Sequence, residues 1–261
     1  MSLALLEQHG AIATITLNRP ESRNALSIDL LQALHARVDE LGASVPGRNA
    51  RNGGGGGAAA RVLVLTGAGT SFCAGMDLKQ VLSDPDKPLE LLGLLADLCV
   101  KIRELPCVTI AHVNGAAIGG GCGLTTVCDF ALTFDACKMG FPEVDLGVCP
   151  AVVAPWLVRK IGAGKARAVL LRGGLMTGRD AAELGLVTRS VPEAGGLAGA
   201  VKELAERLAG GGAAALAATK RLLNEIDGSL DRDLSRRAAE LSAQVLKTPE
   251  TLSTLRGKLG A

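Results

Sequence analysis

Three consecutive glycines, Gly119–Gly121, stand where an extended apolar segment gives way to residues with helical spacing. Each glycine at the start of a helix lowers helix stability by roughly 0.5–1 kcal/mol relative to alanine, so a triplet at this position indicates a specific role. The first turn of a helix has N–H groups without an intrahelical partner, and the helix dipole favours negative charge at that end. The triplet therefore predicts a site that holds a developing anion.

A second junction is similar to the first. Residues 64–79, VLTGAGTSFCAGMDLK, also end a predicted strand in small residues, so a backbone N–H can be presented at close range. Two N–H donors from different loops can form an oxyanion hole. After both junctions comes Glu143, in the segment FPEV. A glutamate in an apolar pocket can exchange protons near neutral pH, which makes Glu143 the candidate acid/base.

Other catalytic and nucleotide-binding motifs fit less well. A GxGxxG frame that begins at Gly67 has Phe72 in place of its third glycine. A P-loop frame fails at Ala166, where Ser or Thr is required, and no GxSxG elbow occurs. These mismatches disfavour a dinucleotide, a P-loop nucleotide and a nucleophilic serine.

The composition excludes several classes of partner. The formal net charge is only +2, so no strong field for nucleic acid or anionic membranes is expected. One Trp and no Tyr leave few platforms for stacking on bases. No uncharged apolar stretch reaches the roughly 18–20 residues that a membrane helix needs. We expect neither a nucleic-acid partner nor a membrane span.

The seven cysteines are odd in number and form no CxxC pair, and the three histidines are far apart in the sequence. Zinc-ligand spacing is absent, so no metal site is expected, and the thiols are expected to be reduced and mostly buried. The first ten residues lack a basic region, and Glu7 interrupts their apolar run. With no targeting signal visible, we expect a cytoplasmic or organelle-matrix protein.

The rest of the pattern alternates strands with turns and helices. Residues 12–17 predict a half-buried strand, and an amphipathic helix begins near Ser27, which can cap it. Repeated strand–turn–helix units favour a layered or spiral α/β core. The other expected strands are 62–67, 107–113 and 128–134, and the other expected helices near the core are 88–105 and 151–161.

Two regions depart from this pattern. Residues 43–60 are rich in glycine and predict a flexible insertion. From about Gly195 the composition shifts to Ala, Leu, Lys and Glu, which predicts helices at 200–209, 213–227 and 230–247. The predicted division is therefore a core at 1–195 and a helical module at 196–261, which covers the core or a neighbouring subunit.

Taken together, five segments resemble the crotonase, or enoyl-CoA hydratase/isomerase, superfamily. The resemblance covers nearly the whole chain apart from the glycine-rich insertion. The matching segments are NRPESRNAL (18–26), SFCAGMDLK (71–79), HVNGAAIGGGCGL with CDFAL (112–132), FPEVDLGVCP (141–150) and GGLMTGRDAAELGLVTRSVP (173–192).

The resemblance implies an α/β fold, a crotonase-like spiral of β-β-α units, with a C-terminal helical module that serves oligomerisation. It implies self-association as a trimer or a dimer of trimers. It also implies an acyl-CoA thioester as substrate, with no separate cofactor because CoA is part of the substrate.

Specific residues follow from the same resemblance. The N–H groups of Met76 and Gly120 would hold the thioester oxygen while Glu143 moves protons. Removing a proton α to a thioester places charge on that oxygen, and losing one such donor costs about 2.7–4 kcal/mol. The matching substrate-binding positions are Arg23, Ala25, Ala74, Met76, Asp77, Leu78, Lys79, Gly119, Gly120 and Gly123.

One departure from the family concerns Gly123. Hydratases of the family that use a paired acid and base have a glutamate at this position, so only Glu143 remains here. The segments GCGLTTVCD and PAVVAP (150–155) are similar to a 3-methylglutaconyl-CoA hydratase-like subgroup, in which glycine at this position is frequent. We therefore expect a hydratase-like enzyme for a branched or unsaturated acyl-CoA. A single-glutamate Δ3,Δ2-enoyl-CoA isomerase is the alternative, and a noncatalytic acyl-CoA binder is the alternative of another class.

Four further residues are weaker candidates. Asp77 is expected to cap the helix that follows it rather than take part in chemistry. His112 lies on a predicted buried strand, and Cys122 is expected to be a packing thiol. Asp145, two residues after Glu143, is a possible second carboxylate.

Overall fold

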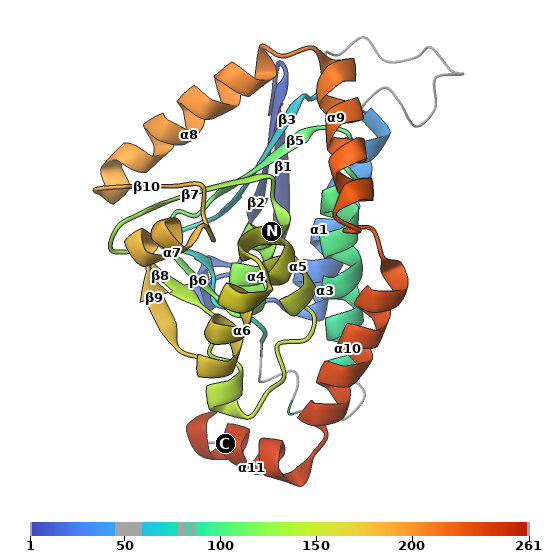
Figure 1. Cartoon of the computed structure of the whole chain (residues 1–261), viewed down its shortest axis with the longest axis vertical. Coiled ribbons are helices and arrows are strands. Elements are labelled where there is room, and N and C mark those ends of the chain that lie inside the picture. The colour runs from blue at the N-terminus through green and yellow to red at the C-terminus, as the bar shows by residue number, and fades with distance from the viewer. Residues whose placement is uncertain (1, 45–58, 78–81, 83, 85–86, 260–261) are drawn as a thin grey trace.

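The computed structural model describes residues 2–44, 59–77, 82, 84 and 87–259 (Figure 1). Most of the predicted glycine-rich insertion lies outside the described residues, as do Leu78 and Lys79. The expectations for those positions stay predictions.

Two sheets form the core. The larger one has strand order β1-β2-β3-β5-β7-β10, and all its neighbours are parallel except the antiparallel pair β1–β2. Its strands are β1 (Ala4–His9), β2 (Ile12–Leu17), β3 (Val62–Gly67), β5 (Val108–His112), β7 (Phe130–Phe134) and β10 (Arg189–Val191). The smaller sheet contains β4 (Ser71–Cys73), β6 (Ala116–Ile118), β8 (Lys138–Gly140) and β9 (Leu175–Thr177).

The chain visits these sheets in a repeating order. After the β1–β2 hairpin and the helix that follows it, the chain runs through one strand of the large sheet, one strand of the small sheet and then helix, as in β3–β4–α3 (Lys87–Glu104) and β5–β6–α4 (Gly120–Val127). The parallel strands within each sheet require such crossovers. The predicted spiral of β-β-α units is therefore confirmed.

Helices cover the outside of the spiral (Figure 1). Ser27 Oγ accepts a hydrogen bond from the Leu30 N–H at 3.2 Å, so the expected helix cap is present. The remaining helices are α1 (Ile28–Ser44), α5 (Ala154–Ile161), α6 (Ala163–Arg172), α7 (Gly178–Leu184), α8 (Ala194–Ala209), α9 (Ala213–Ile226), α10 (Arg232–Leu246) and α11 (Pro249–Leu259), with short 3-10 turns at Pro20–Ser22 and Val144–Leu146. No helix in the described ranges is long and apolar enough to span a membrane.

The C-terminal helices pack on the rest of this chain. Helix α8 places Leu197 and Val201 against Val62 and Ile110 of the large sheet. Helix α10 runs alongside α3, and α11 packs on the turn at Val144–Leu146 (Figure 1). The predicted division at residue 195 and the oligomerisation role stay predictions.

Candidate active site

The glycine triplet adopts a conformation that side chains would disturb. Gly119 has φ +53° and ψ −123°, and α4 begins at the next residue. Its N–H donates to the Gly140 carbonyl at 2.8 Å, and its carbonyl accepts from the Gly123 N–H at 2.8 Å. A Cβ on Gly121 would lie 2.5 Å from the Cys73 carbonyl oxygen. The triplet thus combines close packing with a helix start whose first N–H groups have no intrahelical acceptor.

The second junction presents the backbone of Met76. Leu26 and Met76 form an isolated parallel bridge, in which the Leu26 N–H donates to the Gly75 carbonyl at 2.7 Å. The Asp77 N–H donates to the Leu26 carbonyl at 2.9 Å. In this parallel bridge Leu26 bonds to the residues before and after Met76, namely Gly75 and Asp77. The N–H of Met76 itself is therefore not used by the bridge.

Met76 and Gly120 line one small cavity together with Glu143. Its volume is about 20 Å³, which is close to the space that one water molecule needs. Apart from Glu143, the described side chains around it are mostly apolar. They are Met76, Leu92, Leu95, Val148, Cys149, Pro150, Val152, Val153 and Ser242.

Glu143 is buried, with 8% of its surface exposed. A Cβ on Gly119 would lie 2.9 Å from Glu143 Oε1, so the carboxyl group faces the glycine triplet. Its Oε2 atom has no hydrogen-bond partner in the part of the chain that the structure describes. Burial raises the pKa of Glu143 to about 7, because the charged form loses its hydration. Such a group can both accept and release a proton near neutral pH.

Gly123 faces Val153 rather than open space. A Cβ on Gly123 would lie well within 3.0 Å of Val153 Cγ1, closer than real side chains approach. Val153 is almost fully buried and immediately precedes α5. The sequence marks PAVVAP as distinctive, but it gives no role to Val153, because its relation to Gly123 depends on how α5 packs against α4.

Two hydroxyl groups of the C-terminal helices hold the loop that follows Glu143. Thr251 Oγ1 donates to the Gly147 carbonyl at 2.7 Å. Ser242 Oγ donates to the Cys149 carbonyl at 2.7 Å and accepts from the Ala151 N–H at 3.2 Å. Sequence reasoning missed both residues, since no local motif links them to a loop about a hundred residues away.

Asp145 fixes the same loop from another side. Its Oδ2 accepts a hydrogen bond from the Gly174 N–H at 2.7 Å, and Lys258 Nζ donates to its backbone carbonyl. The described lining of the Glu143 cavity does not include it. The geometry therefore gives Asp145 a contact with the loop before β9 rather than the place of a second carboxylate in the cavity.

The segment 18–26 lies beside the Met76 junction, as its substrate-binding assignment requires. The Ala74 N–H donates to the Arg23 carbonyl at 3.0 Å. Arg19 Nη1 donates to the Ala25 carbonyl at 3.1 Å and forms an ion pair with Asp77 at 2.8 Å. Arg23, Ala25, Ala74 and Asp77 are thus brought together next to Met76. The Asp77 carboxylate is engaged by Arg19, a partner that the sequence did not suggest.

Asn24 is a structural residue of this segment that sequence reasoning missed. It is fully buried and has φ +55°, in the left-handed region that asparagine tolerates. Its side-chain amide donates to the carbonyls of Ala68 at 3.0 Å and Ser71 at 2.9 Å. Asn24 therefore ties the segment to the turn between β3 and β4.

Six of the seven cysteines are buried, and Cys149 is partly exposed. Burial raises the pKa of the Cys122 thiol to about 12, which agrees with a packing role. His112 is largely buried on β5, and this burial lowers its pKa. Across the described residues, no group of three or more His, Cys, Asp or Glu side chains is arranged to hold a metal ion.

Comparison with known proteins agrees with this geometry. The family model described as "Enoyl-CoA hydratase/isomerase" matches residues 7–253. A Thermus thermophilus protein named "Putative enoyl-CoA hydratase" is 35% identical over 254 residues, which cover 95% of this chain and 94% of that protein. A solved enoyl-CoA hydratase from Mycobacterium avium has a TM-score of 0.85 at 29% identity, covering 100% of this chain and 97% of the other. One from Bacillus halodurans has a TM-score of 0.85 at 25% identity, covering 98% and 100%.

Proposed function

Because the chain belongs to the enoyl-CoA hydratase/isomerase family, we propose that the Glu143 cavity processes an unsaturated acyl-CoA through a thioester enolate. Met76 and Gly120 line the cavity from two separate segments of the chain. In this proposal their backbone N–H groups stabilise the thioester oxygen as charge develops on it. Glu143 removes the α-proton and returns it elsewhere on the acyl chain. The observation that carries this proposal is the buried, unpartnered Glu143 carboxyl group opposite these two backbone positions.

Migration of the double bond between Cβ–Cγ and Cα–Cβ is the reaction that the cavity favours. Such migration needs one base that takes a proton from one carbon and returns it to another. Glu143, with a pKa of about 7, can carry out both steps. Val153 fills the space beside Gly123, so the described cavity offers no second carboxylate to activate water. Here the structure favours the isomerase over the hydratase that the sequence suggested.

Hydration remains the second candidate, and one observation favours it. The cavity has about 20 Å³ of free space, enough for one water molecule beside Glu143. In that reaction Glu143 would activate the water and then supply the proton to Cα. One relative, 29% identical to this chain, is named a short-chain-enoyl-CoA hydratase in Clostridium acetobutylicum.

The lining also bears on the acyl group. No Lys, Arg or His is among the described residues around the cavity. A distal carboxylate, such as a methylglutaconyl group carries, would lose its hydration there without a cation to offset the cost. We therefore propose a short, uncharged acyl group and do not propose the methylglutaconyl substrate that the subgroup suggested.

The experiment supplies purified protein with 3-enoyl-CoA and 2-enoyl-CoA of four to eight carbons, and analyses the products by mass spectrometry in ordinary and deuterated water. Conversion between 3-enoyl and 2-enoyl forms supports isomerisation, and incomplete uptake of deuterium supports return of the same proton by Glu143. A 3-hydroxyacyl-CoA product supports hydration. Binding of the thioesters without any turnover would overturn the enzymatic proposal in favour of a noncatalytic acyl-CoA binder.

A further inference from the structure

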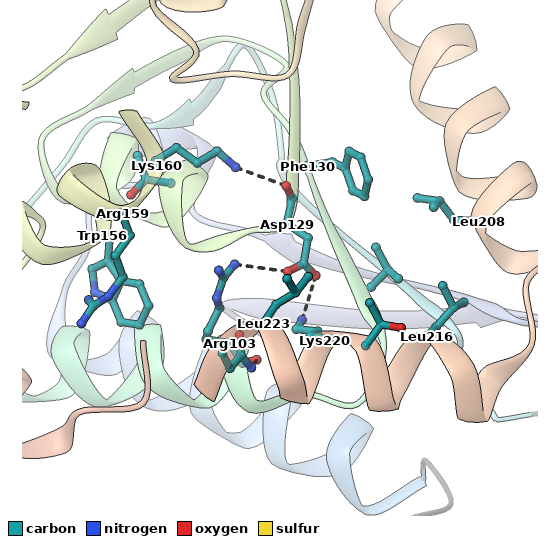
Figure 2. A pocket seen from close by; sticks show the side chains of 14 residues that line it. Arg103, Asp129, Phe130, Trp156, Arg159, Lys160, Leu208, Leu216, Lys220 and Leu223 are labelled. Atoms are coloured by element: carbon teal, nitrogen blue, oxygen red, sulfur yellow. Dashed lines mark hydrogen bonds and ion pairs between the residues drawn. The ribbon is translucent and has the colours of Figure 1, made fainter. Parts of the chain in front are cut away.

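A second and much larger cavity lies away from Glu143, between α9 and the core (Figure 2). Its volume is about 460 Å³, within the range of 300–1,000 Å³ that is typical of small-molecule sites. Helix α5 separates the two cavities, since Val153 just before it lines the Glu143 cavity and Trp156 within it lines the larger one. No step of the proposed reaction uses this space.

Cationic groups exceed carboxylates at one end of this cavity. The lining includes Arg103, Arg159, Lys160 and Lys220 but only one carboxylate, Asp129. Asp129 forms ion pairs with Lys220 at 2.9 Å and Arg103 at 3.2 Å. Burial alone raises the pKa of Asp129, but Lys220, the Thr109 N–H and Arg103 together outweigh this effect, and the net pKa is lowered. The carboxylate is therefore ionised and already fully engaged.

Two lining cations, Arg159 and Lys160, form no ion pair with a carboxylate in the described chain. The Nζ of Lys160 donates to the backbone carbonyls of Cys128 at 3.0 Å and Asp129 at 3.2 Å. An ammonium group has three N–H donors, so one remains for a ligand. Burial lowers the pKa of Lys160 because the charged form loses hydration. An anion bound at Nζ would offset that cost.

The other side of the cavity is apolar. Figure 2 shows Phe130, Leu208 and Leu216 across from the charged groups around Asp129. Val108 and Leu223 also line the cavity. An anionic end beside an apolar wall matches a molecule with a charged head and a hydrocarbon tail.

We propose that this cavity binds a medium-chain monocarboxylate, with the carboxylate at Lys160 and the hydrocarbon tail against Phe130, Leu208 and Leu216. The carboxylate fits because it accepts the remaining N–H of Lys160, while Arg159, which forms no ion pair in the described chain, adds positive potential. The tail stabilises the complex through burial of apolar surface.

Trp156 provides a direct test, because it is the single tryptophan of the chain, lines the cavity, and no tyrosine is present. Its ring already lies 5.4 Å from the Arg159 guanidinium carbon. Purified full-length protein is titrated with octanoate, octanol and acetate while tryptophan emission is recorded. The expected result is a saturable change with octanoate, at least tenfold weaker binding of octanol, and no effect of acetate. Equal affinities for octanoate and octanol, or no saturable change, would overturn the proposal.

Matched variants assign the effect to this cavity. Lys160→Gln is expected to weaken octanoate binding at least tenfold and leave octanol unchanged. Lys202→Gln removes the same charge from an exposed position on α8 and is expected to change neither. If Lys160→Gln fails to fold, Thr219→Phe, at an exposed lining position, tests the site by narrowing it. Equal binding by Lys160→Gln and Lys202→Gln, or by Thr219→Phe and wild type, contradicts the assignment.

Discussion

Val153 occupies the space into which any side chain at position 123 would have to extend. A Cβ on Gly123 would lie well within 3.0 Å of Val153 Cγ1, and both residues are buried. The space next to α4 is therefore apolar and closed. A paired acid and base is prevented here by packing as well as by the identity of residue 123.

Restoring a glutamate alone should therefore harm the protein. Gly123→Glu is expected to lower the free energy of unfolding by about 1–3 kcal/mol or more, because it overpacks the contact with Val153. Adding Val153→Ala should recover part of this loss, measured as a coupling energy in a double-mutant cycle with denaturant unfolding. Independent, additive effects of the two substitutions would contradict the contact.

The same pair tests the chemistry of the cavity. In the double variant Gly123→Glu/Val153→Ala, a second carboxylate gains room near Glu143, so hydration should rise relative to isomerisation. The ratio of 3-hydroxyacyl-CoA to migrated enoyl-CoA measures this shift, with Val153→Ala alone as the control. An unchanged ratio in a folded double variant would show that water addition does not depend on this position.

Glu143→Gln should abolish most of the turnover without unfolding the protein. Loss of an acid/base group costs typically 10²–10⁴-fold in rate, so kcat is expected to fall within that range. Glu203→Gln, the same change at an exposed position on α8, should leave kcat unaltered. Near-normal kcat in Glu143→Gln would remove Glu143 from the mechanism.

Glu143 should also make stability depend on pH. Its pKa is about 7 in the folded state against an ordinary value of 4.5, so the unfolded chain releases this proton at lower pH than the folded chain does. The folded state therefore loses stability as pH rises from 4.5 to 7, by about 3 kcal/mol in total, and the loss is complete above pH 7.

Glu143→Gln lacks this titration, so the difference in unfolding free energy between wild type and variant isolates it. Urea unfolding at intervals from pH 4.5 to 8 measures the difference. Relative to the variant, wild type should lose stability progressively as the pH rises toward 7. A difference that stays constant with pH would place the folded-state pKa of Glu143 near its ordinary value.

Thr251→Val should disturb the Glu143 loop from a distance. The substitution keeps the shape but removes the hydrogen bond to the Gly147 carbonyl, and a typical hydrogen bond contributes about 0.5–1.5 kcal/mol to stability. We expect a severalfold lower kcat and a shifted midpoint of the pH–rate profile, since the loop positions the carboxyl group. Thr251→Ser retains the hydroxyl and should restore both.

Thr254→Val offers the matched control for this experiment. Thr254 lies one turn later on α11, and its hydroxyl donates only within the helix, to the Glu250 carbonyl at 3.0 Å. This variant should leave the pH–rate profile in place. If Thr251→Val and Thr254→Val lower stability alike and neither moves the pH midpoint, Thr251 has no positioning role.

The sequence predicted the large-sheet strands better than the small-sheet strands for a physical reason. Strand β3 is a run of buried apolar residues, and β2 alternates between buried and half-buried positions. Both are recognisable strand patterns in a sequence. Strands such as β4 and β6 have only three residues, too few to show any period. Helix α11 was also missed, although its neighbours α9 and α10 were predicted.

Some residues of the candidate site could be predicted from the sequence, and others could not. Gly119–Gly121 and Glu143 could be predicted because the chemistry restricts which residue types can stand there. Val153, Ser242 and Thr251 could not, because their contribution depends on which side chain or loop they touch in the folded chain. Nothing in the residue type of a valine or threonine distinguishes these positions from other buried ones.

The hydrogen bond from Thr251 to the Glu143 loop has a consequence for protein synthesis. A ribosome adds Glu143, Met76 and the glycine triplet long before it reaches α11, so the growing chain carries every reacting group while the loop still lacks its bond to Thr251. The set of contacts that holds the loop is complete only after α11 has emerged and docked. Full activity should therefore appear late in translation, and a nascent chain that stops before α11 should be less active than the full chain.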